Sequence, residues 1–262
     1  MMMNIYQHFR EDEQSFIDQV VDWILQVENQ YAPYLTNFLN PRQLFIVEAI
    51  VRQYDTIYYQ AFGGYEGAEQ QRILIYPPYY EPTAEDFEIT LFEINYPTKF
   101  SELSHGQVMG SVLGTGISRG NLGDILTDGQ RWQFFVDARM KDFILMNVDH
   151  VGRINVHLEE KSFENLVQEM DKWELEEIIV SSLRMDVILA RALNVSRNRA
   201  KTLIKDQKVK LNWVEVERPD IEVEEYDILS IRGFGRVKIG AQQGITRKDN
   251  LVLKIGIIDR NT

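Results

Sequence analysis

The chain has 262 residues, 28 Lys and Arg against 40 Asp and Glu, a formal net charge of −12, and no cysteine. The lack of cysteine excludes a disulfide scaffold, a thiolate zinc site and a cysteine nucleophile. The acidic balance argues against uniform coating of nucleic acid, because affinity for phosphate comes from Lys and Arg. No apolar stretch reaches the roughly 18 residues that span a bilayer, and residues 1–10 do not look like a secretory signal. We therefore expect a cytoplasmic protein without membrane insertion.

The first 80 residues predict a mainly helical N-terminal domain. Apolar residues recur at helical spacing over residues 11–30, and Asn40-Pro41 is a favourable start for a second helix. Residues 57–62 and 72–76 are expected to be extended, with Gly63-Gly64 between them. Pro77-Pro78 then marks a domain boundary near residue 80.

Residues 81–180 predict a middle domain in which strands and helices alternate. This pattern is typical of a small α/β sandwich, ferredoxin-like or RRM-like, with one sheet and helices on one face. The strands are expected at 87–94, 131–136 and 153–158, and the helices at 105–113, 137–148 and 162–176.

Charge is unevenly distributed along the chain. Residues 1–182 carry a net charge of −17, whereas residues 183–262 carry +5. Residues 184–210 alone hold eight basic residues against Asp186 and Asp206. Such asymmetry indicates either a nucleic-acid-binding module attached to an acidic body or a solvated basic helix face.

The third predicted domain, residues 181–262, begins with two short helices over 183–193 and 197–206. Ser196 is expected to cap the second helix. Arg197, Lys201 and Lys205 lie four residues apart, so they share one helix face. Three like charges in a row repel one another, and a helix that keeps them suits a polyanionic partner. Strands are predicted after these helices, at 208–211, 226–231 and 251–258.

The pattern Arg184-Met185-Asp186, Leu189-Ala190, Ser196-Arg197 and Leu203-Ile204, with Asp227-Ile228 downstream, resembles the RNA-binding domain of ribosomal protein S4. The resemblance covers about residues 181–240. It implies an α+β chain whose last domain has the S4-like αL fold and contacts the backbone of structured RNA. It assigns RNA binding to Arg184, Arg191, Ser196, Arg197, Arg199, Lys201, Lys205, Lys208 and Lys210, and the basic turn that follows adds Arg232 and Arg236.

Upstream, Phe62-Gly63-Gly64-Tyr65 and the stretch from Gly110 to Ile125 extend the resemblance to the bacterial YlmH-type proteins over nearly the whole chain. Two positions depart from the family pattern. Gln70 stands where Arg is usual, and Gly106-Gln107 stands where a basic–acidic pair is usual. The family implies partners in rRNA, tRNA and the large ribosomal subunit, a role in rescue of stalled translation, and a link to cell-division proteins.

Two other functions stay open. One is an RNA-modifying enzyme with its site around Gly110–Asp124, although this glycine stretch follows a predicted helix and lacks the ending of a phosphate loop. The other is a cell-division interaction scaffold. Its interface would be formed by exposed tyrosines of the acidic N-terminal domain, namely Tyr31, Tyr34, Tyr58 and Tyr59.

We expect neither a metal nor another cofactor. The four histidines, His8, His105, His150 and His157, are not spaced as metal ligands. His105 near Asp124 could act as a catalytic base, but a helix-capping or packing role is the expected one. No catalytic motif is convincing, because Arg184-Met185-Asp186, which resembles a pseudouridine synthase motif, lies in the RNA-binding helix. The sequence thus predicts a non-catalytic RNA-binding protein.

Overall fold

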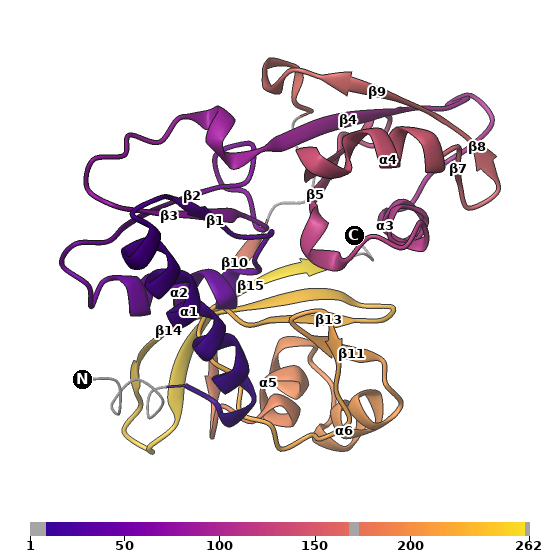
Figure 1. Cartoon of the computed structure of the whole chain (residues 1–262). Coiled ribbons are helices and arrows are strands. Elements are labelled where there is room, and N and C mark those ends of the chain that lie inside the picture. Colours follow the sequence, from indigo (N-terminus) through magenta and orange to yellow (C-terminus); the bar gives the residue numbers. More distant parts are fainter. Residues whose placement is uncertain (1–8, 168–172, 260–262) are drawn as a thin grey trace. The chain divides into compact units, whose positions relative to one another are not determined.

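The computed structural model describes residues 9–167 and 173–259, and the chain forms two compact units, Met1–Met170 and Asp171–Thr262 (Figure 1). The first unit contains the predicted N-terminal domain and most of the predicted middle domain. The second unit contains the basic C-terminal module. The division into three domains stays a prediction, and each unit is described by itself below.

The N-terminal part of unit 1 packs two helices against a small sheet. Helix α1 (Gln14–Gln30) buries the predicted apolar stripe, and helix α2 (Pro41–Val51) begins at the expected cap, because the Asn40 side chain accepts a hydrogen bond from the Gln43 amide. The apolar sides of both helices form one hydrophobic core with Ile73 and Ile75. The antiparallel sheet has the order β1 (Tyr34–Leu35), β3 (Arg72–Tyr76), β2 (Tyr58–Phe62).

The middle part of unit 1 is the expected α/β sandwich. Its antiparallel sheet has the order β5-β6-β4-β9, and the chain connects the strands in the βαββαβ sequence of ferredoxin-like folds. A short hairpin, β7 (His150–Val151) and β8 (Ile154–Asn155), precedes the last strand. The elements are β4 (Ile89–Asn95), α3 (His105–Gly114), β5 (Leu122–Thr127), β6 (Trp132–Asp137), α4 (Lys141–Asn147) and β9 (His157–Lys161).

Both faces of this middle sheet are covered. Helices α3 and α4 pack on one face, where Phe92 and Phe134 are buried. On the other face, the Tyr65 ring stacks on Phe135 with 5.5 Å between ring centroids, and Phe38 joins the same cluster. The approach is so close that a Cβ on Gly64, whose φ is +102°, would lie 2.3 Å from the Phe135 ring. The N-terminal part therefore seals the face that the helices leave open.

The predicted helix over residues 162–176 is wrong. Phe163–Asn165 forms a single 3₁₀ turn, Leu166 is extended, and strand β10 (Glu174–Val180) includes the end of the predicted range. The apolar side chains that suggest a helical stripe instead follow the covered sheet face, where the Val167 amide donates to Gln133 Oε1 over 3.0 Å. Met170, the last residue of that stripe, lies outside the described residues.

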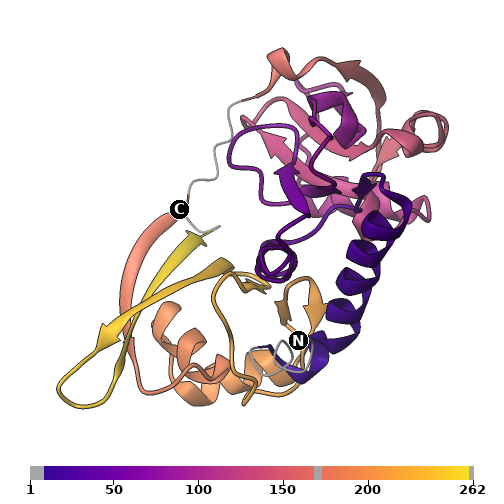
Figure 2. The same ribbon diagram turned by 60° about the vertical axis from the view of Figure 1, so that its left-hand side comes forward.

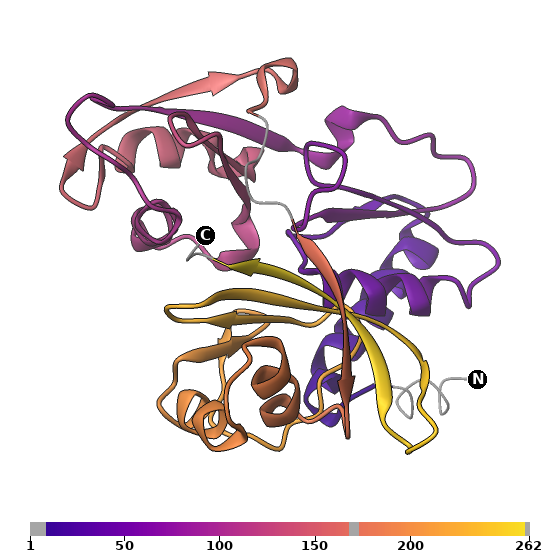
Figure 3. The same ribbon diagram turned by 180° about the vertical axis from the view of Figure 1, so that it is seen from behind.

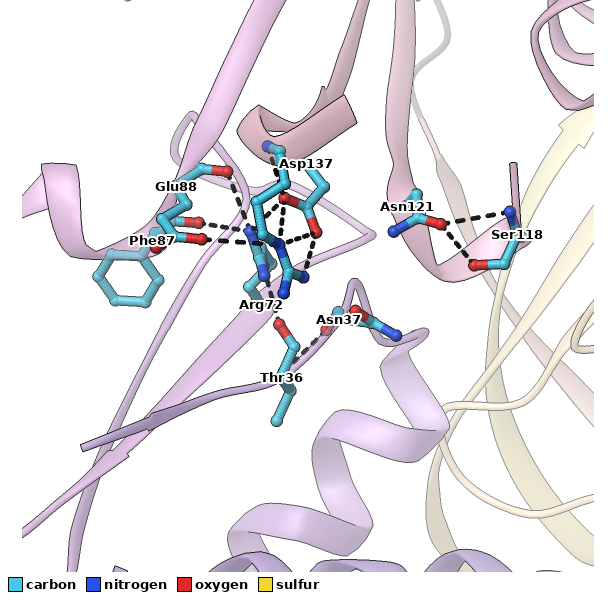
Figure 4. Close-up of polar contacts among 9 residues, drawn as sticks. Thr36, Asn37, Arg72, Phe87, Glu88, Ser118, Asn121 and Asp137 are labelled. Carbon is cyan, nitrogen blue, oxygen red and sulfur yellow. Dashed lines mark hydrogen bonds and ion pairs between the residues drawn. The ribbon is translucent and has the colours of Figure 1, made fainter. Parts of the chain in front are cut away.

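Arg72 connects the N-terminal and middle parts of unit 1 (Figure 4). Its guanidinium is fully buried, and it donates to the Thr36 carbonyl over 2.8 Å and to the Phe87 and Glu88 carbonyls over 3.0 and 2.9 Å. It also lies 3.5 Å from the buried carboxylate of Asp137 at the end of β6. Arg72 of β3 thus contacts two places in the middle part: the residues just before β4 and the end of β6.

Asp124 of β5 makes a second connection. Its carboxylate accepts hydrogen bonds from the Glu69 and Gln70 backbone amides, over 2.7 and 3.0 Å, and from the Tyr65 hydroxyl over 2.8 Å. Burial raises the pKa of Asp124, although these hydrogen bonds favour its charged form. Asp124 therefore fixes the loop between β2 and β3 to the middle sheet.

Unit 2 is a twisted antiparallel sheet with two helices on one face (Figure 3). The strand order is β10-β15-β14-β13-β11-β12, and β14 and β15 form a long hairpin with β10 along its edge (Figure 2). Helices α5 (Met185–Ala192) and α6 (Arg197–Lys205) bury their apolar sides against this sheet. The remaining strands are β11 (Val209–Leu211), β12 (Val214–Glu215), β13 (Ile228–Ile231), β14 (Gly235–Ile245) and β15 (Leu251–Asp259).

Replacing Arg72 with Leu should destabilise unit 1 by about 3 kcal/mol, because buried carbonyls lose their donor and Asp137 loses a neighbouring cation. Urea unfolding, followed by hydrogen exchange of peptides from β3 and β6, measures the change. The control is Arg52→Leu, which removes an exposed arginine of the same unit and should cost less than about 0.5 kcal/mol. Equal costs for the two variants would show that Arg72 is not a structural connection.

Candidate nucleic-acid interface

The basic face of unit 2 is built on the turn between α5 and α6. Asn194 takes a left-handed conformation with φ of 51°, which the short turn requires, and Asn tolerates this conformation better than most residues. Ser196 then caps α6 as predicted, because its hydroxyl accepts from the Arg199 amide over 3.2 Å. Leu203 and Ile204 face the core. The polar side of α6 consequently points away from the sheet.

Asp186, in the first turn of α5, organises the cations of this face. Its side chain is fully buried, yet it accepts from Arg197 Nε over 2.9 Å and from Arg184 Nε over 3.1 Å. Lys201 Nζ lies 3.8 Å from the same carboxylate. The side chains of Arg184, Arg197 and Lys201 remain 35%, 49% and 41% exposed. The buried carboxylate of Asp186 thus positions three predicted RNA-binding residues, and part of each side chain stays exposed to solvent.

The electrostatics of Asp186 follow from these contacts. Burial alone would raise the pKa of its carboxyl group, but the hydrogen bonds from Arg197 and Arg184 outweigh burial, and the pKa is lowered. The same contacts raise the pKa of Arg184. Asp186 is therefore ionised near neutral pH. The sequence pattern places Asp186 correctly in the RNA-binding helix but does not reveal this role.

Four of the predicted cations have no ion-pair partner among the described residues. Their side chains are exposed and lie on α5, on α6 and directly after β13: Arg191, Arg199, Lys205 and Arg232. Lys208 instead pairs with Asp206 over 3.1 Å, and Lys210 approaches Glu215 to 3.5 Å. The unpaired cations are the ones whose full charge is available to a polyanion.

Lys210 and Arg236 lie on a different face from the helices. The register aligns Lys210 with Ser230 and Ser230 with Arg236, and residues opposite one another in neighbouring strands point to the same side. Their neighbours Val209 and Val237 are buried on the helix-covered side, so this row points away from the helices. The Arg236 guanidinium stacks over the Trp173 ring, 5.0 Å from its centroid. The predicted residues therefore divide between a helical face and an outer sheet face.

In unit 1, the glycine stretch and the two positions that depart from the family pattern have structural roles. Gly110 and Gly114 lie within α3, and Gly116 follows it with φ of +99°, so the glycine stretch is a helix end and a turn. Gln70, which replaces the usual Arg, is buried and donates its backbone amide to Asp124. Gln107 completes the cap of α3 with Ser104. The departures from the family pattern thus fall at one buried position and one helix start.

The sheet of the middle part cannot bind single-stranded bases in the way that RRM domains do. Those domains stack bases on aromatic side chains of the open sheet face, and here Tyr65, Phe38 and Phe163 cover that face. In residues 9–167 and 173–259, no group of three acidic or histidine side chains is placed to hold a metal ion. No helix in these same ranges has the length and apolar character needed to cross a membrane.

Two short helices with a cationic outer side, followed by a strand that continues into a curved sheet, define unit 2 as an RNA-binding domain of the S4 class. The S4 domain family matches residues 183–229. Residues 82–165 match the family described as "Putative RNA-binding domain in YlmH", and residues 12–80 match the family described as "YlmH, N-terminal".

One relative is the "Ribosome-associated protein quality control protein P2" of Bacillus subtilis (strain 168), which is 39% identical over 248 residues, or 95% of this chain and 96% of the relative. The solved structure of the "Cell division protein ylmH from Streptococcus pneumoniae" superimposes with a TM-score of 0.56 at 35% identity, over 62% of this chain and 99% of that one. The chain belongs to the YlmH family. The expected family, the mixed α+β fold and the RNA-binding class are thereby confirmed.

The stabilising contribution of Asp186 should depend on pH. Its folded-state pKa is below the unfolded value of about 3.9, so the contribution is complete above that value and disappears as pH falls through the folded-state pKa. Asp186→Asn should cost about 2 kcal/mol at pH 7 and less at pH 3, because the carboxyl group of the unfolded chain is then mostly protonated and part of the contribution is lost. Urea unfolding of both proteins at the two pH values measures this difference. A cost that is the same at pH 3 and pH 7 would contradict the ionised, paired state.

Proposed function

We propose that this protein is a non-catalytic factor that binds structured RNA, rRNA or tRNA, on the large ribosomal subunit, through the helical face of unit 2. The single observation that carries the proposal is the carboxylate of Asp186. It holds Arg184 and Arg197 in fixed positions, and the same pair of helices also carries the unpaired Arg199 and Lys205. A cationic surface fixed before binding loses less side-chain entropy when it meets phosphate.

The contacts of this face suit the RNA backbone. Guanidinium groups bind phosphate oxygens with two parallel hydrogen bonds, and α6 presents Arg197, Arg199, Lys201 and Lys205 within nine residues. Contacts of this kind position a protein on folded RNA and carry little sequence information. The shape of the RNA, with its spacing of phosphates, would therefore determine the target.

The ribosome is the proposed location because the Bacillus subtilis relative is named for ribosome-associated quality control. The match covers nearly the full length of both chains, so it includes unit 1 as well as the S4 domain. We extend the same role, assistance to stalled translation in the cytoplasm, to this protein.

A non-catalytic role agrees with the positions of the acidic residues that an enzyme could use. Asp186 is bound by two arginines, and Asp124 accepts three hydrogen bonds that hold a loop. Both carboxylates support the fold. The alternative is an RNA-modifying enzyme with its site near Gly110–Asp124, and altered rRNA modification in a deletion strain would favour it.

Removing two unpaired cations should weaken binding without disturbing the fold. The double variant Arg199→Ala and Lys205→Ala should bind Bacillus subtilis large subunits about tenfold more weakly or worse in co-sedimentation at about 0.15 M salt. Arg197 and Lys201 are not changed in this variant, because their loss would leave the buried carboxylate of Asp186 with fewer neighbouring cations and would destabilise the fold.

The matched control changes the same net charge elsewhere in unit 2. Arg247 and Lys248 are exposed in the turn between β14 and β15, so the double variant Arg247→Ala and Lys248→Ala should sediment as the unmodified protein does. Equal losses in both double variants would indicate that general charge, and not the helical face, determines binding.

The salt dependence of RNA affinity counts the phosphate contacts. Each Lys or Arg that neutralises a phosphate steepens the decline of log affinity with log salt by about one unit. Removal of Arg199 and Lys205 should therefore reduce the slope by about two, as measured by fluorescence anisotropy with a labelled RNA hairpin between about 0.05 and 0.3 M salt. An unchanged slope would mean that neither side chain neutralises phosphate.

A second role, in cell division, is supported by the similar Streptococcus pneumoniae structure, which is named as a cell division protein. The acidic, tyrosine-rich surface of unit 1 is the feature that favours it. Such a role requires a contact with a division protein that survives nuclease treatment of the extract, whereas an association that nuclease abolishes would be mediated by RNA.

A further inference from the structure

Five tyrosine rings form a continuous row on the surface of unit 1, which we call the tyrosine strip. Tyr31 ends α1, Tyr58 lies on β2, Tyr76 ends β3, and Tyr79 and Tyr80 follow in the next loop. Successive ring centroids are 4.9 Å apart for Tyr31 and Tyr79, 6.3 Å for Tyr79 and Tyr80, 6.1 Å for Tyr80 and Tyr76, and 6.1 Å for Tyr76 and Tyr58.

The strip is exposed. Tyr31, Tyr79 and Tyr58 have 61%, 54% and 49% of their surface open, while Tyr76 and Tyr80 between them are half-buried. Tyrosine is enriched at protein interfaces, and adjoining exposed rings are unusual on a surface with no partner. The strip therefore has the composition and the exposure of an interaction surface.

The rings are held in place by contacts that leave their faces open. The Tyr79 hydroxyl donates to the Tyr31 carbonyl over 2.7 Å, and the Tyr80 hydroxyl donates to Asp86 over 2.8 Å. Tyr58 and Tyr76 are directly paired across β2 and β3. Because the hydroxyls of Tyr79 and Tyr80 are engaged within the protein, these two rings offer mainly their faces to a partner and lose little order on binding.

The surroundings of the strip are acidic. Residues 11–90 contain fourteen Asp and Glu but three arginines, and two of these, Arg42 and Arg72, are buried. The third, Arg52, is engaged with Glu48 and Tyr59. Near the strip, acidic residues either contact a ring or lie within three residues of one: Glu28, Asp55, Glu81 and Asp86.

Charge decides between the two partners that aromatic platforms commonly bind. Single-stranded nucleic acid stacks its bases on such rings, but it also requires a positive groove for its phosphates. A cationic peptide is attracted both by the ring faces, through cation–π contacts, and by the neighbouring carboxylates. Extended proline-rich segments in particular dock on rows of aromatic side chains.

We infer that the tyrosine strip is a docking site for an extended, arginine- or lysine-containing segment of a partner protein. This inference goes beyond the proposed RNA-binding function, because it concerns a surface of unit 1 and does not use the cations of unit 2. Guanidinium or ammonium groups would lie over the Tyr31, Tyr79 and Tyr58 rings, and Glu28, Asp55 and Glu81 would balance their charge.

The test measures the binding of a fluorescein-labelled (Arg-Pro)₅ peptide to the full chain by anisotropy at about 0.15 M salt, with (Glu-Pro)₅ and decauridylate as comparison probes. We expect (Arg-Pro)₅ alone to bind through the strip. The double variant Tyr58→Thr and Tyr79→Ala, in which Thr preserves the preference of β2 for strand, should weaken this binding at least about tenfold. Tyr79→Phe keeps the ring and should retain the affinity.

The controls separate the strip from general acidity and from misfolding. Phe100→Ala removes an aromatic side chain of unit 1 that is 88% exposed outside the strip, and it should bind as the unmodified chain does. Glu28→Gln with Glu81→Gln should weaken binding and reduce its salt dependence without changing a ring. A single cooperative melting transition should show that every variant is folded. RNA-hairpin affinity should stay unchanged in every variant, so a failure of the RNA-binding proposal would be recorded separately.

Three results would overturn the inference. They are no binding of (Arg-Pro)₅ by the unmodified chain, the same affinity in the tyrosine double variant and the Phe100 control, or binding of decauridylate that depends on the strip. The last result would assign the surface to nucleic acid.

Discussion

The basic surface of unit 2 depends on one buried carboxylate. Arg184, Arg197 and Lys201 carry like charges at close range and would repel one another without Asp186, whose charge lies beneath all three. Burial of an isolated carboxylate is costly, and the two guanidinium groups offset that cost, as the lowered pKa indicates. The ion cluster thus joins the polar sides of α5 and α6 and, at the same time, fixes the surface cations.

The sequence predicts this region well where the signals are local. The cap at Ser196, the cationic face of α6 and the glycine turn after β13 each depend on residues within a few positions of one another, and the structure contains all three. The ion cluster is different, because Asp186 and Arg197 are separated by a turn whose angle no periodicity specifies. The same reason explains why Lys210 and Arg236 fall on the outer sheet face, which only the strand register reveals.

In unit 1, the predicted elements overlap three of the four strands and both helices of the ferredoxin-like topology. The pattern misses β5, which begins at the end of the glycine stretch, and it cannot reveal what covers the sheet. Arg72 and Asp124 have no pattern in the sequence that marks them, since their partners are mainly backbone groups of distant segments. The error at residues 162–176 has the same origin. Apolar residues that suit a helix also suit an extended segment on a covered sheet, and tertiary packing decides between them.

The uneven distribution of charge is what would allow one chain to bind both RNA and a cationic peptide, each at a different surface. An acidic surface repels phosphate, so in the proposed assignment the cations of unit 2 would attract RNA, while the tyrosine strip would favour a cationic peptide over nucleic acid. A net charge of −12 therefore does not contradict RNA binding, because affinity depends on the local field near the contact within about a Debye length. Had the positive charge been spread evenly over the chain, neither surface could discriminate, since both would attract phosphate and neither would favour a basic peptide.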